Sequence, residues 1–498
     1  MAAGGSAVDG AIAANAVVGV VRPTDCGIGG DLFALVHEPG TRAPAVLNAS
    51  GRAGSGVSAS DMRAGGHARM PSRHPATVTV PGCVDGWLAL GERFGNLPLA
   101  DLLAPAIGLA TDGFPVSPEM SWNLAENEAL LAGQGSAAEL YPQGGVPREG
   151  SRLTRPALAE ALQRIGEEGR AGFYDGELAA AISGATGSLL TPDDLAANQP
   201  DWVEPMGLEL LTGHTAWTVP PSSQGYVTLA TLWLVERLGG SSDFDDPEYH
   251  HLLIEAYRAA VWDRDALLAD PDHMSLSPLQ LLDEERLFER LARIQSGRVT
   301  EWPAPRDVPG GTAYMCAVDG QGLGVSLMQS NFGGIGSGLS AGATGVWLQN
   351  RGAGFTLEEG HPNMLAPGKR PLHTLAPSLW TQDDRLSMLL GTRGGHLQPQ
   401  LVAQLAAQQL LVGFSPGEAQ AAPRWVLNDF GPGRGSAPVF EEEIPTRVAT
   451  GLTERGHNVG LVERQRDWGP AAIIRLLENG TREGAADPRV STASVVVG

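Results

Sequence analysis

PGGTAYMCAVDGQGLGVSLMQSNFGGIGSG, residues Pro309 to Gly338, is the stretch that decides the fold. A Gly-Gly pair precedes Thr312, and an alternating apolar run then leads into a DGQG turn, a second strand-like run and a glycine-rich loop. Alternation with a period of two and a central turn rich in Gly and Asp are typical of two strands joined as a hairpin. The stretch therefore predicts a β-hairpin that begins at a threonine.

Thr312 has two interpretations. Inside a chain its hydroxyl is a weak nucleophile, but cleavage after Gly311 would give it an α-amino group with a pKa of about 8, placed to act as its own general base. Alternatively, Thr312 is one ordinary strand residue among many. The rest of the sequence has to decide between the two.

Composition places the chain among large globular proteins. Of its 498 residues 42% are hydrophobic and 18% charged, which suits a protein with a sizeable core. The net charge of −22 opposes binding to nucleic acid. Cys26, Cys83 and Cys316 lie far apart and form no CxxC pair, so we expect neither a disulfide framework nor a zinc site. No metal or organic cofactor is expected.

The sequence favours a cytoplasmic protein without membrane spans. No apolar run approaches the roughly 20 residues of a membrane helix, and the start MAAGGSAVDG lacks the basic region of a signal peptide. The chain nevertheless opens abruptly on a helical pattern, as though a segment that could carry a signal preceded it.

Helical and strand signals alternate along the chain. Residues 7–21 are small and apolar with helical spacing, and a strand-like run follows GIGGD at residues 27–31. Because these glycines precede a strand rather than follow one, we do not expect a dinucleotide loop. His250 and His251 are adjacent in a helical stretch and face different sides, so they do not form a helical metal pair.

Arg52, Gly394 and Gly395 are further candidate site residues. Arg52 follows a strand in a loop of small residues, where it is either a solvated charge or a planar fork for a substrate carboxylate. Gly394 and Gly395 lie between a strand and a helix, where their N–H groups either stabilise an oxyanion or simply form a tight turn. Residues 296–311 have the Pro/Gly character of an exposed linker that chain cleavage requires.

Strings spread over nearly the whole chain resemble, in the same order, the γ-glutamyltransferase family of N-terminal-nucleophile hydrolases. They are GGSAVDGAIAAN, CGIGGDLFALV, SGRA, PGCVDGWLALGERFGNLPLADLLAPAIGLATDGFPVS, LTPDDLA, PPSSQG, TAYMCAVDGQG, GIGSGL, GTRGG and DPR. The resemblance implies a four-layer αββα sandwich, one interlocked domain made as a proenzyme. Cleavage would give a large subunit, residues 1–311, and a small subunit, residues 312–498, that stay together as a heterodimer, with a dimer of such pairs as a further option.

The resemblance also implies roles for the candidate residues. Thr312 matches the family's nucleophile, and Ser330 falls where the family has a hydroxyl that contacts the nucleophile. Gly394 and Gly395 match the oxyanion-hole glycines, and Arg52 matches the arginine that grips the donor's carboxylate.

Other positions depart from the family pattern. Ala313 replaces a second threonine after the nucleophile, and Phe332 replaces an asparagine of the glycine-rich loop. Gly354 falls where an acidic residue receives the glutamyl α-amino group, and His373-Thr374 replaces a Ser-Ser pair. An ammonium group bound without that acid would be desolvated and unpaired, at a cost of several kcal/mol.

Three functions follow as expectations. The first is γ-glutamyl transfer or glutathione hydrolysis, with water or an amino acid as acceptor. The second is hydrolysis of another carboxylate-bearing amide of the oxamate or glutaryl type, because NFGGIGSG and QNRGAGF resemble the family branch with oxamate amidohydrolases and cephalosporin-acylase-like members. The third is an uncut, non-catalytic relative that binds a ligand.

Overall fold

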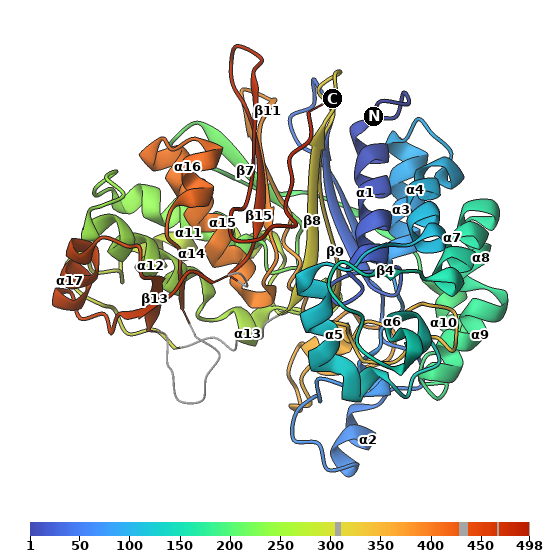
Figure 1. Cartoon of the computed structure of the whole chain (residues 1–498). Coiled ribbons are helices and arrows are strands. Elements are labelled where there is room, and N and C mark those ends of the chain that lie inside the picture. The colour runs from blue at the N-terminus through green and yellow to red at the C-terminus, as the bar shows by residue number, and fades with distance from the viewer. Residues whose placement is uncertain (304–309, 428–436, 466–467, 498) are drawn as a thin grey trace.

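The computed structural model describes residues 1–303, 310–427, 437–465 and 468–497. Two sheets lie face to face in the middle of the molecule, and helices cover the outer face of each (Figure 1). This is the αββα sandwich that the family resemblance implied. Part of the expected linker at 296–311, residues 304–309, lies outside the described residues.

The first sheet carries the predicted hairpin at one edge. Within the described ranges its strand order is β5-β2-β1-β9-β8, with each neighbouring pair antiparallel. Its strands are β1 (Asp31–His37), β2 (Ala45–Ala49), β5 (Asp201–Val203), β8 (Gly311–Val318) and β9 (Gly324–Phe332). Strand β1 pairs with β9 in a register that sets Asp31 opposite Ser330. Strands from both sides of the Gly311-Thr312 bond therefore share one sheet.

The second sheet has the order β16-β15-β11-β10-β7-β6 in the described part of the chain. Its strands are β6 (Met206–Glu209), β7 (His214–Thr218), β10 (Ser378–Gln382), β11 (Arg385–Thr392), β15 (Ala471–Leu476) and β16 (Arg482–Ala486). This sheet also combines strands that precede Gly311 with strands that follow it.

The strand residues alternate between two cores. In β9, Val325 and Leu327 pack against the helical side, whereas Met328 points between the sheets. Between the sheets Met328 meets a cluster that includes Leu379 and Leu389. Gly391 also faces this layer, and a Cβ there would lie 2.4 Å from the Tyr314 ring, so only glycine lets the two sheets approach at this point.

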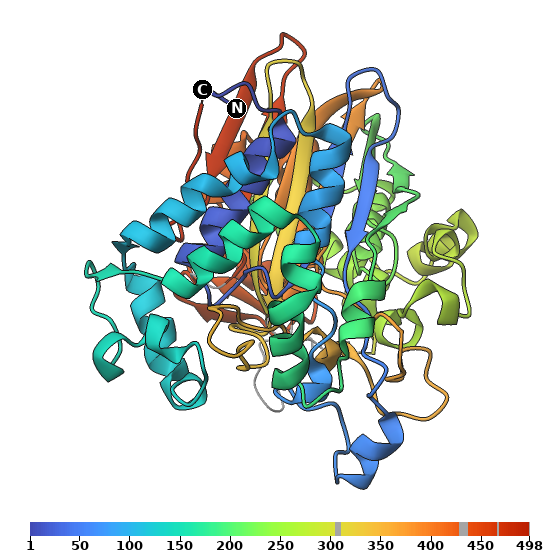
Figure 2. The same ribbon diagram turned by 90° about the vertical axis from the view of Figure 1, so that its right-hand side faces the viewer.

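Each outer layer is built on long helices. The helices over the first sheet are α1 (Ala7–Val21), α3 (Cys83–Phe94), α4 (Leu99–Asp112) and α7 (Pro156–Glu168). Figure 2 shows this blue to green layer in front of the strands. The helices over the second sheet include α11 (Tyr226–Leu238), α12 (Pro247–Val261) and α15 (Gln398–Ala407). Helix α1 has the bounds that the small apolar pattern predicted, and Ser6 and Asp9 cap it.

Other elements surround the sandwich. The remaining helices are α2 (Ala59–Ala64), α5 (Pro118–Leu131), α6 (Ala137–Leu140), α8 (Ala171–Tyr174), α9 (Gly176–Ala185), α10 (Pro192–Ala197), α13 (Arg264–Leu267), α14 (Glu284–Leu291), α16 (Pro416–Ala421) and α17 (Thr446–Glu454). The remaining strands are β3 (Phe114–Pro115), β4 (Arg152–Leu153), β12 (Trp425–Leu427), β13 (Pro438–Glu441) and β14 (Gly460–Val462). No helix of the described residues has both the length and the apolar character needed to cross a membrane.

Candidate active site

Thr312 lies near the start of β8 and is buried. Its hydroxyl donates a hydrogen bond to the Gly311 carbonyl oxygen over 2.6 Å. The side-chain amide of Gln398, the first residue of α15, donates to the same hydroxyl oxygen over 3.3 Å. The Thr312 hydroxyl is therefore held between the bond that would be cut and the second sheet's helical layer.

Ser330 is positioned next to the same carbonyl group. Its hydroxyl donates to the Gly311 oxygen and accepts a 2.7 Å hydrogen bond from the Phe332 backbone N–H. The Gly311 carbonyl thus accepts two hydroxyl hydrogen bonds, one from Thr312 and one from Ser330. Hydrogen bonds to a carbonyl oxygen polarise it toward nucleophilic attack.

Gly394 and Gly395 form the turn between β11 and α15, where the sequence placed them. Their φ angles of 122° and 58° are positive, a region that favours glycine. A Cβ built on Gly310 would lie 3.2 Å from the Gly395 Cα, so the turn abuts the segment before Thr312. Among the described residues neither glycine N–H donates a hydrogen bond to another backbone group. Such N–H groups are suited to receive an oxyanion.

A cleft of about 1410 Å³ opens beside this arrangement. Gly310, Gly311 and Gly394 line it at one end, and Phe332 and Gly354 line another part of its wall. Other lining residues come from the α5 region and from the loops after β9, including Glu119, Trp122, Asn123, Asn350, Phe355, His361 and Leu372. The cleft is large enough for a small-molecule substrate.

Phe332 connects the two parts of the cleft. Its backbone pairs with Gly311, and its φ of 75° is unusual for a bulky residue. The guanidinium carbon of Arg351 lies 3.2 Å from the centre of the Phe332 ring. Arg351 in turn donates a 2.9 Å hydrogen bond from Nη1 to the Thr374 hydroxyl. Strained backbone at such a position is typical of functional sites.

His373 is buried behind this part of the cleft. Its Nε2 donates to Asp31 Oδ2 over 3.1 Å, and its ring packs edge-on against Phe33. Burial, together with the positive charge of Arg351, lowers the pKa of His373 to about 4 although the interaction with Asp31 acts in the opposite direction. At neutral pH the imidazole is therefore uncharged and positions Asp31.

Arg52 does not line the cleft in the described part of the chain. Its Nη1 donates to Asp270 Oδ2 over 3.3 Å and to the Gly368 carbonyl over 3.1 Å, and Nη2 lies 3.8 Å from Asp201. The side chain is 39% exposed. Acidic partners already occupy the guanidinium that the sequence assigned to a substrate carboxylate.

The sequence reasoning missed Gln398 and Arg351. Gln398 opens the helix that follows the Gly394-Gly395 turn, so a polar residue there could have been recognised as close to the oxyanion site. Arg351 stands three residues before Gly354 in the QNRGAGF string, but nothing local shows that it packs on Phe332.

Another polar cluster lies outside the cleft. His251, Glu255 and His457 place potential ligand atoms within 4.8 Å of one another. These atoms already take part in hydrogen bonds, between His251 Nδ1 and His457 Nε2 at 2.8 Å and from Arg258 and the Thr300 N–H to Glu255. His250 points elsewhere, to the Phe244 carbonyl, as expected for adjacent helical residues.

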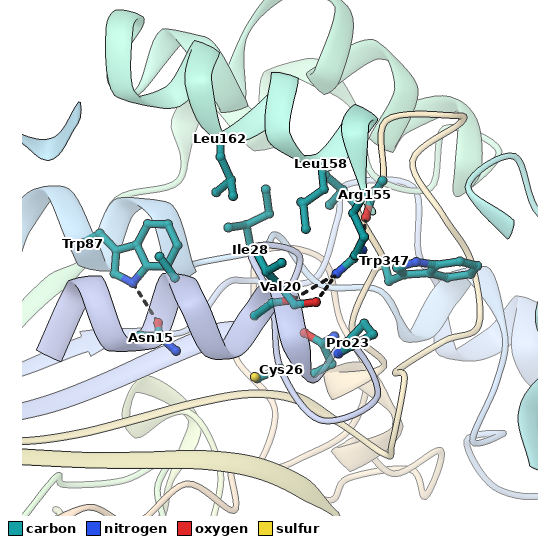
Figure 3. Close-up of a pocket in the computed structure, with 16 residues that line it drawn as sticks. Asn15, Val20, Pro23, Cys26, Ile28, Trp87, Arg155, Leu158, Leu162 and Trp347 are labelled. Atoms are coloured by element: carbon teal, nitrogen blue, oxygen red, sulfur yellow. Dashed lines mark hydrogen bonds between the residues drawn. The ribbon is translucent and has the colours of Figure 1, made fainter. Parts of the chain in front are cut away.

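A small internal cavity of about 20 Å³ lies between α1 and α7 (Figure 3). Asn15 accepts a hydrogen bond from Trp87, and Arg155 donates to the backbone carbonyls of Gly19 and Val20. Its walls are otherwise largely apolar and it holds about one water molecule at most, so it belongs to the packing of the core.

The fold is that of the N-terminal-nucleophile hydrolases. The crystal structure of a cephalosporin acylase from Bacillus halodurans matches this structure with a TM-score of 0.91 and 34% identity, covering 100% of this chain and 92% of that one. The chain belongs to the gamma-glutamyltranspeptidase family, whose model matches residues 1–497.

Curated relatives agree with this assignment. A glutathione hydrolase-like YwrD proenzyme of Bacillus subtilis is 36% identical over 99% of this chain and 94% of its own. An oxamate amidohydrolase proenzyme of Klebsiella pneumoniae is 37% identical over the same shares of the two chains. These relatives are made as proenzymes, and their names point to more than one amide substrate.

Proposed function

We propose that this protein is an autoprocessing amidohydrolase that uses Thr312 as an N-terminal nucleophile on a small, carboxylate-bearing amide. The observation that carries the proposal is the Thr312 hydroxyl at the start of β8, 2.6 Å from the Gly311 carbonyl oxygen and beside the Gly394-Gly395 turn. Family membership and the proenzyme relatives support it.

Maturation would begin with attack of the Thr312 Oγ on the Gly311 carbonyl carbon. A C–O bond forms, the C–N bond breaks, and the proton of the hydroxyl passes to the departing amine of Thr312. The Ser330 hydroxyl, which already donates to the Gly311 oxygen, would stabilise the negative charge that develops there. Water then hydrolyses the ester, leaving a Gly311 carboxylate and a free Thr312 α-amino group.

Turnover would repeat the same chemistry on an external amide. The Thr312 α-amino group takes the proton of its own hydroxyl as Oγ attacks, and returns it to the leaving amine. The N–H groups of Gly394 and Gly395 would hold the tetrahedral oxyanion, and Gln398 would orient the Thr312 oxygen. Water or an amino-acid amine then resolves the acyl-enzyme.

The products would be residues 1–311 and 312–498, which stay together as a heterodimer. Pairing between β1 and β9, and the mixed strand origin of the second sheet, supports this assembly. Separating the pieces would expose the inter-sheet core around Met328 and Leu389 to water.

A substrate without an α-amino group suits the pocket better than a γ-glutamyl donor. Gly354 offers no carboxylate to an ammonium group, and Arg351 brings a positive charge to the same place. Acyl groups of the oxamate or glutaryl type fit this pattern. γ-Glutamyl hydrolysis or transfer is the second candidate, supported by the glutathione hydrolase-like relative. Arg52 stays a candidate anchor for the carboxylate, in competition with Asp270.

A denaturing gel and three substrates test the proposal. Freshly made protein should convert from one band into fragments of residues 1–311 and 312–498, with threonine at the new N-terminus. A persistent full-length band would favour the non-catalytic alternative. The cut protein should then release ammonia from oxamate or p-nitroaniline from glutaryl-p-nitroanilide faster than p-nitroaniline from γ-glutamyl-p-nitroanilide. The reverse preference would identify a γ-glutamyl enzyme.

A further inference from the structure

Arg351 is a buried cation with unused hydrogen-bonding capacity. The residue is 1% exposed and belongs to a short helical turn, Arg351–Gly354. Its Nη1 donates to Thr374, but Nε and Nη2 have no hydrogen-bond partner among the described residues. Buried arginines normally have their N–H groups paired, because an unpaired buried donor is costly.

No carboxylate of the described residues forms an ion pair with Arg351. Asp31 is near enough to attract it, yet its oxygens accept hydrogen bonds from Gly51, Gln349 and His373. Burial lowers the pKa of Arg351 to about 9, which leaves it a cation at neutral pH. The chain therefore keeps a positive charge here without supplying its counter-ion.

The unpaired Nη2 is aimed at the cleft residue Gly354. A Cβ built on Gly354 would lie 3.8 Å from Nη2 of Arg351. Gly354 lines the cleft, and so does Phe332, whose ring lies against the guanidinium and whose backbone pairs with Gly311. Gly354 thus stands between the unpaired Nη2 and the cleft that holds the scissile segment, and it places no side chain over the guanidinium.

We infer that Arg351 is the receptor for the substrate's carboxylate, which reaches Nη2 and Nε from the cleft beside Gly354. The ligand class is a short acyl group that ends in a carboxylate and carries no ammonium, as in monoamides of small dicarboxylic acids. This inference rests on the proposed function and identifies the part of the cleft that selects its substrate. Arg52, with Asp270 as partner, then has a structural role.

Substrate preference in charge-matched variants tests the assignment. In Arg351→Gln, kcat/KM for glutaryl-p-nitroanilide should fall on the order of 100-fold, as expected when one partner of a buried charge pair is lost. Butyryl-p-nitroanilide lacks the carboxylate and should change less than about 3-fold. Arg351→Lys should restore part of the glutaryl preference. Arg52→Gln, the competing anchor, should leave the ratio of the two substrates within about 3-fold. An equal loss on both substrates in Arg351→Gln would overturn the inference.

Gly354 offers a matched pair of variants. A Cβ at this position meets the Leu372 carbonyl oxygen at 2.7 Å, and Gly354→Ala and Gly354→Asp both introduce this contact. Only the aspartate supplies an internal counter-ion for Arg351. The kcat/KM of Gly354→Asp for glutaryl-p-nitroanilide should therefore be at least about 10-fold lower than that of Gly354→Ala. The ratio of kcat/KM for the γ-glutamyl substrate to that for the glutaryl substrate should be higher in Gly354→Asp. Identical ratios in the two variants would contradict the assignment.

A binding measurement separates this inference from the proposed function. Glutarate or oxamate should raise the Tm of the wild-type protein and of Thr312→Ala, and should not raise that of Arg351→Gln. A rise in Tm with glutarate or oxamate, without any chain cleavage or turnover, would support the carboxylate site and contradict the proposed chemistry. If the protein is cut and active but neither anion raises its Tm, the inference about Arg351 is wrong and the proposed chemistry stands. The same conclusion follows if the anions still raise the Tm of Arg351→Gln.

Discussion

The two ends of the cleft follow the family pattern to different degrees. At one end, the hydroxyls of Thr312 and Ser330 both donate to the Gly311 oxygen, and residues of the family type stand at these positions and at the Gly394 turn. At the other end, a glycine replaces an acid at Gly354, and Arg351 brings a positive charge into the gap. The residues around the nucleophile face the same amide group in every substrate, so their arrangement need not vary. The residues that contact the rest of the acyl group must match its charge, which differs between substrates.

The largest effect is expected from removing the nucleophile. Thr312→Ala should leave a single uncut chain with no measurable hydrolysis, because it removes the oxygen that attacks in both reactions. Thr312→Ser keeps a hydroxyl and should still be cut. Two fragments from Thr312→Ala on a denaturing gel would remove this residue from the scheme.

The oxyanion turn should have the next largest effect. Gly394→Ala places a side chain on a backbone with φ 122° and shifts the N–H groups, so kcat should fall by a factor of about 10² to 10³. Gly413→Ala is a matched control, because it also alters a positive-φ glycine but with nothing within 4 Å of the added Cβ. A similar kcat for both variants would leave Gly394-Gly395 as a plain turn.

Ser330 tests the maturation step separately from turnover. Ser330→Ala removes one of the two hydrogen bonds to the Gly311 oxygen, and the rate of chain cleavage should fall by a factor of about 10 to 100. A time course on denaturing gels measures this rate. Ser337→Ala is a control that removes a buried hydroxyl bound to the Leu348 carbonyl instead, and cleavage at the wild-type rate is expected there.

The smallest effect concerns pH and stability. The pKa of His373 is about 4 in the folded protein against an ordinary 6.5. Between these two pH values the unfolded chain therefore binds a proton at His373 and the folded chain does not. Stability is then complete above about pH 6.5 and falls by about 1.4 kcal/mol per pH unit as the pH drops toward 4. His250, outside the cleft, has a similarly lowered pKa because of burial.

Urea unfolding of the uncut Thr312→Ala chain at about pH 7 and pH 5 measures this dependence, because a single chain can refold. His373→Gln and His250→Gln should each flatten it by a similar amount. Only His373→Gln should also alter substrate preference, because only His373 lies beside Arg351. A full pH dependence in both variants would assign the acid sensitivity to other groups.

Local signals in the sequence predicted the scaffold well. The spacing of small apolar residues predicted α1, and the DGQG turn predicted the β8–β9 hairpin. Such features depend on neighbours within a few residues. The roles assigned to Thr312, Ser330 and the glycine turn came from the family resemblance, and they stay predictions until the variants are measured.

The recognition end was less predictable because its contacts join distant segments. The proposed role of Arg351 depends on its contacts with Phe332 and Thr374 and on the absence of a side chain at Gly354. Arg52 likewise meets Asp270, far away in the sequence. Electrostatic partners of this kind depend on the tertiary fold, and neither propensity nor periodicity reports them.

The pairing of β1 with β9 has a consequence for the life of the molecule after maturation. Before the cut, both strands belong to one chain, so refolding after damage is a unimolecular event. After the proposed cut, the same sheet would have to be reassembled from two separate polypeptides, whose effective concentration would fall from that of tethered segments to that of free molecules. The proposed cut would therefore create the amino group of Thr312 and also make the enzyme harder to refold. The lifetime of the mature enzyme would then depend on a slow rate of unfolding.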